Sequence, residues 1–369
     1  MSQVDDRRLE FEIKAGRIRH LMELRGWDWL AISSVAAFAW ATAGGRAYIN
    51  SFDSVGVATL LYGRENTVLI TSNVEMPRLE MEELTGLPIE YRVADWTDLY
   101  FGNLDAIKET VQRGVLASDV PLEGAVIAKG LIELRATLLP NEVRRMRELS
   151  SDVALSLEQV ARSLKPGQSE EVIAADIRAA LGSKAILSPV TLVATDERVF
   201  QHRHPLPTEK VLDRYAMLIT SAVKYGLYCS VTRLVHFGPL PVELRDKARA
   251  CAEVDAAFIS ATRVGFLSSE IFAQGQQAYA AQGFCDEWTM HHQGGASGYE
   301  AREHFVGGGH TFSVNARQCF AWNPSITGVK SEDTIIALED GPEVLTKTPN
   351  WPTIMTAKGI ARPGILVRQ

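Results

Sequence analysis

The stretch Glu332–Thr346, EDTIIALEDGPEVLT, is the part of the sequence that bears most strongly on the fold. Its run Thr334–Leu338 is apolar and rich in β-branched residues, which favours a strand. The run Cys319–Trp322 just before it has the same apolar character, and both runs follow a pair of expected helices. We therefore interpret Glu332–Thr346 as the strand-rich end of a helix–helix–strand unit.

The same order of elements occurs earlier in the second portion of the chain. In Lys165–Ile173, and again in Arg263–Phe272, a Gly ends one helix and a Ser with a nearby Glu begins the next, as helix caps require. Strand-rich sequence follows the earlier pair at Ala185–Ala194 and Met217–Val235. We predict a duplicated unit that forms a domain with two-fold pseudosymmetry and a functional site between its halves.

The first portion of the chain alternates between helix-like and strand-like segments, which predicts an α/β domain. The expected helices are Arg8–Gly26, Met76–Leu84 and Leu104–Arg113, and the expected strands are Trp29–Ile32, Val55–Tyr62, Asn66–Ile70, Ile89–Val93 and Gly124–Ile127. Pro140 stops any preceding helix, and Asn141 can cap the next one. The sequence thus predicts an α/β (α+β) protein with one domain at residues 1–137 and a second at residues 138–369.

Length and composition limit the classes of protein to which the chain can belong. The 369 residues carry a formal net charge of −7 and are 46% hydrophobic, which fits a globular protein of two domains and excludes a disordered chain. Mild acidity disfavours a nucleic-acid partner, since phosphate-binding proteins carry a basic face. The longest apolar stretches, such as Leu30–Ala43, are too short or too polar to cross a membrane. An N-terminus without an apolar leader, together with four scattered cysteines, indicates a cytoplasmic protein with reduced thiols.

Side chains that could carry chemistry concentrate in the second portion of the chain. They fall in four segments, at residues 198–208, 225–233, 291–303 and 321–334. The first segment contains His202 and His204 with an Arg between them, and imidazole titrates near neutral pH. These histidines are candidates for proton transfer or for binding a carboxylate. The glycines of the third segment lack the strand and helix context of a dinucleotide site, so we expect no nucleotide and no other cofactor.

These four segments, in this order, resemble the pita-bread peptidase family, which includes prolidase, Xaa-Pro aminopeptidase, methionine aminopeptidase and the non-peptidase creatinase. Glu332–Thr346 is similar to the family's closing strand and hairpin, and Gly226 with Thr232 and Arg233 matches the hairpin that normally carries an Asp ligand. The resemblance covers most of the chain. It implies a creatinase- or prolidase-like N-terminal domain, a pita-bread domain and a homodimer.

The family's peptidases hold two metal ions with two Asp, one His and two Glu. The resemblance places these five ligand positions at Ile219, Ser230, Gly295, Asn323 and Glu332 of this chain. Only Glu332 offers a charged oxygen, whereas a pair of divalent ions needs anionic oxygens or imidazoles. We therefore expect the dinuclear metal site to be absent.

Creatinase is a member of the family that works without metal and uses a loop histidine as its acid and base. Alignment without gaps puts that histidine at His202, and alignment through the Pro-Leu-Pro-Thr run leaves His204 open. The creatinase Arg that binds the substrate carboxylate matches Arg302, and Glu303 or Glu332 would be the carboxylate partner of the histidine. His292, Tyr228 and Asn323 would supply further hydrogen bonds. Creatine itself is not expected as substrate, because the creatinase glutamates that hold its guanidinium group correspond to Thr232 and Asn323.

Three hypotheses for function follow. The first is a metal-independent hydrolase, or another enzyme that cleaves a carbon–nitrogen bond, acting on a small carboxylate-bearing molecule with no nucleic-acid or membrane partner. The second is a ligand-binding pseudoenzyme of the peptidase family. The third is an Xaa-Pro peptidase that recruits metal in another way.

Overall fold

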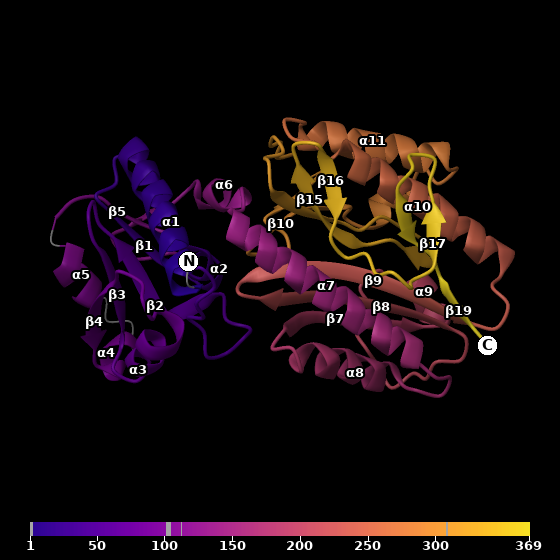
Figure 1. The fold of residues 1–369 in the computed structure, drawn as a ribbon, viewed down its shortest axis with the longest axis horizontal. Helices are drawn as coiled ribbons and strands as arrows, with labels where there is room; N and C mark the ends of the chain where they lie inside the picture. The colour runs from indigo at the N-terminus through magenta and orange to yellow at the C-terminus, as the bar shows by residue number, and fades with distance from the viewer. Residues whose placement is uncertain (1–2, 101–104, 112, 308) are drawn as a thin grey trace. The chain divides into compact units, whose positions relative to one another are not determined.

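The structure is a computed structural model that describes residues 3–100, 105–111, 113–307 and 309–369. The chain divides into two compact units, Met1–Glu142 with Tyr225–Leu227, and Val143–Lys224 with Tyr228–Gln369. Both units combine helices with sheets (Figure 1), so the predicted α/β (α+β) class is confirmed. Within the described residues, no helix is both long enough and apolar enough to span a membrane.

The first unit is built on a six-stranded sheet with the order β4-β3-β2-β1-β5-β6. The strands are β1 (Trp29–Ser34), β2 (Val55–Tyr62), β3 (Thr67–Ser72), β4 (Glu90–Ala94), β5 (Leu116–Ser118) and β6 (Val126–Ile127). The helices are α1 (Gln3–Arg25), α2 (Val35–Ala41), α3 (Met76–Arg78), α4 (Trp96–Tyr100), α5 (Asp105–Val111) and α6 (Leu131–Ala136). Strands β1, β2 and β3 pair in antiparallel fashion. At one edge β4 pairs parallel with β3, and at the other β5 pairs parallel with β1 and β6 with β5.

Most of the expected elements of this unit are present, and two helices differ from expectation. The single helix expected at Met76–Leu84 is a short α-turn followed by a π-helix, η1 (Leu79–Glu83), in which the Leu84 N–H donates to the Leu79 carbonyl at 2.8 Å. The helix expected at Leu104–Arg113 is observed as α5, with Leu104 and Gln112 outside the described residues. The apolar stretch Leu30–Ala43 divides into β1 and α2, because the Ser34 side chain caps the new helix by accepting from the Ala37 N–H.

A buried ion cluster joins α1 to the end of the first unit. The Lys14 ammonium is fully buried and lies 2.7 Å from Glu10 Oε1 and 2.9 Å from Glu142 Oε1. It also donates to the Trp40 carbonyl at 2.8 Å. Glu142 in turn accepts from the Leu139 N–H at 2.7 Å. Because two carboxylates share one ammonium out of water, each member of the cluster depends on the others.

The second unit consists of two halves in which a pair of helices precedes a sheet (Figure 1). The first half contains α7 (Pro140–Ser163), α8 (Glu170–Gly182), α9 (Glu197–Gln201), β7 (Leu187–Thr195), β8 (Tyr215–Lys224) and β9 (Leu227–Phe237). The second half contains α10 (Val242–Ala261), α11 (Ser268–Ala281), η2 (Glu287–Met290), β10 (Gly294–Ser297), β11 (His304–Phe305), β12 (Gln318–Trp322), β15 (Asp333–Leu338) and β16 (Gly341–Val344). Short strands complete it: β13 (Ser325–Ile326), β14 (Val329–Lys330), β17 (Thr353–Met355), β18 (Ala361–Pro363) and β19 (Leu366–Arg368).

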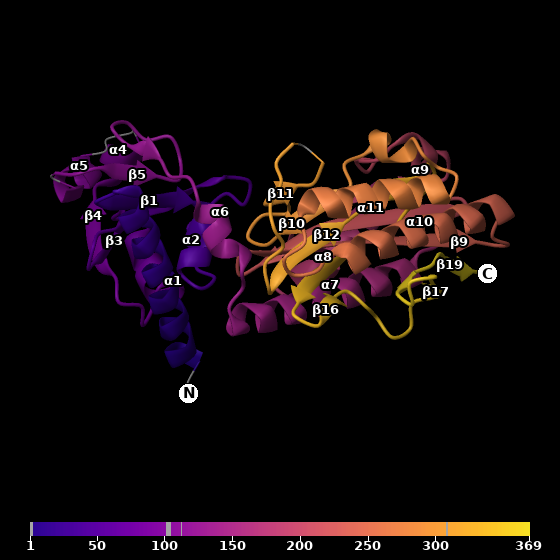
Figure 2. The same cartoon turned by 90° about the horizontal axis from the view of Figure 1, so that it is seen from above.

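Two sheets carry the second unit, with the orders β19-β9-β8-β7 and β11-β10-β12-β15-β16. Helices α10 and α11 run side by side in both views (Figures 1 and 2). The apolar faces of these elements form one core, in which Trp322 of β12 stacks on Phe258 of α10 with ring centroids 4.8 Å apart. The run expected at Thr334–Leu338 is thus a central strand of the second sheet, β15.

The two capping segments occupy equivalent places in the two halves. Gly167 donates its N–H to the Leu212 carbonyl at 2.7 Å, and Gly265 donates to the Val314 carbonyl at 2.9 Å. Both glycines have positive φ, of 92° and 87°, but they do not end the preceding helices as expected, since α7 ends at Ser163 and α10 at Ala261 and the glycines lie in the turns that follow. The caps differ in one respect, since the Ser268 side chain accepts from the Phe312 N–H at 3.1 Å and does not cap α11. The backbone pattern supports the predicted duplication.

Candidate functional site

A cluster of charged side chains forms where the two sheets of the second unit approach each other. Trp322 pairs with Asp333 at the end of β12, so Asn323 and Glu332 leave these neighbouring strands at the same edge. On β9, Thr232 donates its N–H to the Glu332 carbonyl at 3.1 Å and its hydroxyl to Glu332 Oε2 at 2.7 Å. Strand pairing and these two bonds fix the carboxylate in place.

Two cations share the Glu332 carboxylate. Arg302 Nη2 lies 3.1 Å from Oε1, and Lys330 Nζ lies 3.4 Å from Oε2. Although burial opposes ionisation of Glu332, Lys330 and Arg302 hold its pKa below the usual range. Burial also lowers the pKa of both cations, which Glu332 partly offsets. The cluster therefore carries two positive charges and one negative charge, all removed from bulk water.

Arg302 is positioned by the hairpin between β10 and β11. The Glu303 carboxylate accepts from the Tyr299 N–H at 2.9 Å, and the Glu303 N–H donates to the Ala296 carbonyl at 2.8 Å. Arg302 Nη1 then reaches the Ala301 carbonyl at 2.6 Å and Ser230 Oγ at 3.4 Å. Its Nε is buried and has no hydrogen-bond partner in the described structure. One N–H of the guanidinium is therefore unpaired.

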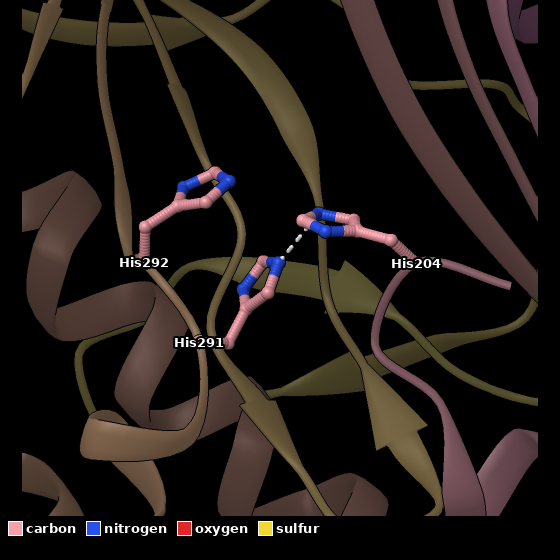
Figure 3. Close-up of side chains that lie close together, drawn as sticks. All are labelled: His204, His291 and His292. Atoms are coloured by element: carbon pink, nitrogen blue, oxygen red, sulfur yellow. Dashed lines mark hydrogen bonds between the residues drawn. The ribbon is translucent and has the colours of Figure 1, made fainter.

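Three histidines lie together on the same unit (Figure 3). His204 comes from the loop after α9, and His291 and His292 come from the segment between η2 and β10. His204 Nε2 and His291 Nε2 are 2.9 Å apart, so one ring must donate a proton and the other accept it. The rings of His291 and His292 stack with centroids 4.3 Å apart. Gln293 holds this segment by donating to the His291 carbonyl at 2.6 Å.

The three imidazoles are favoured in their neutral form. Burial is the first cause for each ring, and the positive charge of Lys330 acts on all three in the same direction. Burial and Arg302 lower the pKa of His292 to about 4, and the pKa of His291 falls further. The pKa of His204 is also below its ordinary value. At neutral pH these rings can accept a proton.

A scan against family models matches the description Metallopeptidase family M24 to residues 144–340, which is more than half of the chain. The chain belongs to metallopeptidase family M24. This confirms the resemblance to the pita-bread peptidases. An uncharacterised peptidase of Staphylococcus haemolyticus is 24% identical over 325 residues, which span 81% of this chain and 92% of that protein.

Solved structures of other M24-like proteins have the same fold. The Xaa-Pro dipeptidase from Bacillus anthracis matches with a TM-score of 0.78 and 17% identity, over 97% of this chain and 100% of that one. The prolidase from Pyrococcus horikoshii matches with a TM-score of 0.76 and 15% identity, over 91% and 98% of the two chains. These similarities establish the architecture.

The residues that the resemblance places at the five metal-ligand positions do not fit a pair of metal ions. Ile219 belongs to the apolar core, and the Glu332 carboxylate is already bound by Arg302, Lys330 and Thr232. Gly295 has a φ of 152°, and a Cβ built there would lie 2.1 Å from the His304 carbonyl oxygen. Backbone therefore fills the place of the histidine ligand, and one committed carboxylate is the only anionic donor among the five positions.

The three-histidine cluster has a spacing that a transition metal ion could use, since its candidate ligand atoms all lie within 4.8 Å of one another. The surrounding charge works against such an ion. The Lys330 ammonium lowers the proton affinity of all three rings, and the same field would repel a divalent cation. The electrostatics of the site favour an anion.

The structure brings some of the predicted residues together and leaves others apart. Arg302 and Glu332 are in contact, and electrostatic coupling connects them with His204 and His292. His202 is exposed, and its N–H donates to the Arg198 carbonyl at the end of α9. The contact with His291 therefore moves the preference between the two loop histidines from His202 to His204.

The remaining predicted residues lie on neighbouring segments. Glu303 supports the Arg302 hairpin, and Tyr228 donates its N–H to the Gly298 carbonyl at 2.8 Å in that same hairpin. Asn323 is buried, and its Oδ1 has no hydrogen-bond partner among the described residues. Sequence reasoning missed His291 and Lys330. The sequence features that could have identified them are the adjacency of His291 to His292 and the position of Lys330 two residues before Glu332.

Proposed function

We propose that this chain is a metal-independent hydrolase that cleaves a carbon–nitrogen bond in a small, carboxylate-bearing substrate. The observation that carries the proposal is the guanidinium of Arg302, paired with Glu332 beside a pair of neutral histidines. In M24 peptidases that bind two metal ions, the metals activate water. Here the positions that would hold them are an apolar side chain, a hydroxyl, a glycine, an amide and one paired carboxylate.

Arg302 and Lys330 would bind the substrate carboxylate. Each oxygen of Glu332 contacts one of the two cations, so neither cation has all of its N–H donors paired with the carboxylate. Arg302 Nε is buried and has no hydrogen-bond partner in the described structure. The Nε–H gives the guanidinium one donor for a second carboxylate. Glu332 then acts as the group that holds both cations in place, and Glu303 as the group that holds the hairpin.

His204 would move the proton. It is the more exposed member of the pair with His291, and its neutral Nε2 or Nδ1 can take a proton from a water molecule. The water oxygen adds to the carbon next to the scissile nitrogen, and the same proton passes to that nitrogen as the carbon–nitrogen bond breaks. His291 fixes the ring of His204 through the 2.9 Å contact. His292, Tyr228 and Asn323 would supply hydrogen bonds to the substrate.

The test is hydrolysis of N-acyl amino acids, N-carbamoyl amino acids and Xaa-Pro dipeptides, followed by mass spectrometry with and without a chelator. We expect turnover that EDTA leaves unchanged and that His204→Asn lowers by about 100-fold or more. Turnover that requires added Mn²⁺ or Co²⁺ would instead show a metal-dependent Xaa-Pro peptidase. Tight binding without turnover would show a ligand-binding pseudoenzyme.

Three further proposals rest on the sequence and the family resemblance. We propose that residues 1–137 form the creatinase-like N-terminal domain and residues 138–369 the catalytic domain, that two copies form a homodimer and that the protein is cytoplasmic. Light scattering of the purified chain tests the homodimer directly.

A further inference from the structure

The charge of the site restricts the substrate beyond its carboxylate. With the three histidines neutral, the cations Arg302 and Lys330 share one carboxylate that both of them contact, Glu332. The side chains of all three are at least nine-tenths buried. A net positive charge out of water is costly until an anion neutralises it. A ligand with a net charge of −1 balances the site.

The carboxylates around the site are already engaged. Asp333, next to Glu332, is bound by Arg233 at 3.0 Å, by Arg362 at 2.6 Å and by the Thr346 hydroxyl at 2.6 Å. Glu287 pairs with Arg203, the neighbour of His204. Glu303 accepts the Tyr299 N–H. Asp255, which also lies near the site, is bound by Arg362 at 2.7 Å through its Oδ2, so the described acidic side chains around Glu332 are held by arginines or by backbone.

One buried hydrogen-bond acceptor at the same edge of the sheet has no donor, and an uncharged N–H group would suit it. Asn323 is only 2% exposed, and its Oδ1 has no hydrogen-bond partner among the described residues. It leaves β12 beside Glu332 of β15, as the pairing of Trp322 with Asp333 requires. A buried amide oxygen without a donor is unfavourable, and an N–H from an amide or ureido group would satisfy it. Such an N–H adds no positive charge to the site.

We propose that the substrate is an amino acid whose nitrogen is acylated or carbamoylated, and that free dipeptides are excluded by their ammonium group. This inference deepens the proposed function and rests on it for the carboxylate anchor. Repulsion between a substrate ammonium and the Lys330 and Arg302 charges is the physical basis of the selection.

The experiment compares matched ligands that differ by one charged group. N-acetyl-L-alanine and glycyl-L-alanine share the amide N–H and the carboxylate, and only the second carries an ammonium. N-carbamoylglycine and glycylglycine form a second comparison of neutral with charged nitrogen. Binding is measured by calorimetry on the full chain, and hydrolysis is followed separately. We expect the neutral member of at least one pair to bind about tenfold more tightly or better than its charged counterpart.

Three variants test the cause of that preference. Lys330→Met removes one positive charge and should reduce the preference several-fold, whereas Lys330→Arg should keep it. Asn323→Glu adds a carboxylate at the edge of the sheet and should shift the preference toward the dipeptide. Circular dichroism and thermal melts confirm that each variant is folded before its affinities are compared.

The outcomes separate this inference from the proposed function. Preferential binding of the neutral ligands without turnover would keep the inference and overturn the hydrolase. Hydrolysis of the dipeptides at equal or higher efficiency would keep a hydrolase and overturn the inference. Failure of every acylated and carbamoylated ligand to bind would also overturn it.

Discussion

Arg302 Nη2 lies 3.1 Å from Glu332 Oε1, so the one carboxylate left at the M24 ligand positions is neutralised by the protein's own guanidinium. Arg302 also reaches Ser230 Oγ, at another of these positions, at 3.4 Å. A fixed cation from the β10–β11 hairpin therefore stands between two positions that the resemblance assigns to metal ligands. Its chemistry is that of an anion receptor.

Replacing Arg302 tests that role. Arg302→Gln should raise KM, or the ligand Kd, by about 100-fold, because it removes both a charge and the bidentate geometry. Arg302→Lys should recover only part of the loss, since an ammonium cannot reproduce the planar pair of donors. Calorimetry with N-acetyl-L-alanine measures the effect, with the exposed Arg263→Gln as the control. Equal affinity of wild type and Arg302→Gln would contradict the assignment.

The pH dependence should respond to Lys330. Its positive charge disfavours protonated His204, His291 and His292, so Lys330→Met should raise their pKa values. A neutral imidazole is the active base, and activity falls as the pH drops through its pKa. The acid limb of the rate profile should therefore move to higher pH in the variant.

NMR titration of the ring protons checks this shift at one residue, since the pKa of His292 is about 4 in the wild type. Lys358→Met, at an exposed site, is the control and should leave the titration unchanged. A His292 pKa that stays constant or falls in Lys330→Met would show that Lys330 does not act on the histidines.

Metal content should be low. The five M24 positions offer one carboxylate that is already paired, so we expect fewer than about 0.1 Mn, Co, Fe or Zn ions per chain after dialysis. Inductively coupled plasma mass spectrometry measures this. Two ions per chain that a chelator removes with loss of activity would contradict the metal-independent proposal.

The close approach of the Gly295 and His304 backbones should affect the free energy of unfolding when Gly295 is replaced. Gly295→Ala puts a Cβ within 2.1 Å of the His304 carbonyl oxygen at a φ of 152°, and should lower the free energy of unfolding by about 3 kcal/mol or more. Gly182→Ala is the matched control, because open space surrounds a Cβ there and φ is not in the positive range. Its effect should stay within about 1 kcal/mol of zero. Urea melts that rank the two variants in the opposite order would disprove this reading.

The buried cluster at Lys14 should dominate the stability of the first unit. Lys14→Met leaves Glu10 and Glu142 buried and facing each other, which should cost about 3 to 5 kcal/mol. The exposed pair of Arg8 and Glu12 is the control, and Arg8→Met should change stability by less than about 1 kcal/mol. Thermal unfolding followed by circular dichroism compares the two, and similar effects would rule out a special role for the cluster.

Sequence reasoning succeeded where local pattern and structure coincide. The strand Val55–Tyr62 was predicted at its observed bounds, because alternation and flanking turns are local properties. Helix α2 was not predicted, since Val35–Ala41 is apolar on every side and shows no helical periodicity. The π-turn after Arg78 likewise has no local signature.

The site residues likewise divide into those that the sequence could indicate and those that only the fold reveals. Glu332 and Arg302 could be proposed from the resemblance, since each lies in a segment with a family counterpart. His291 could not, because its importance depends on the 2.9 Å approach of His204, which is 87 residues away in the sequence. Lys330 lies two residues from Glu332, but the junction between β14 and β15 falls there, so sequence alone does not show that the two side chains are 3.4 Å apart. The choice between His202 and His204 also depended on which ring the α9 loop turns toward His291.

The backbone contact at Gly295 also limits how such a site can evolve. Returning a histidine to that position requires β10 and the His304 segment to separate first, and the Ile219, Ser230 and Asn323 positions must change as well. No single substitution along that route would yield a working metal centre, and the Gly295 step alone would destabilise the fold. A lineage that has reached this arrangement is therefore held in it, and selection can act only on which anions Arg302 and Lys330 bind.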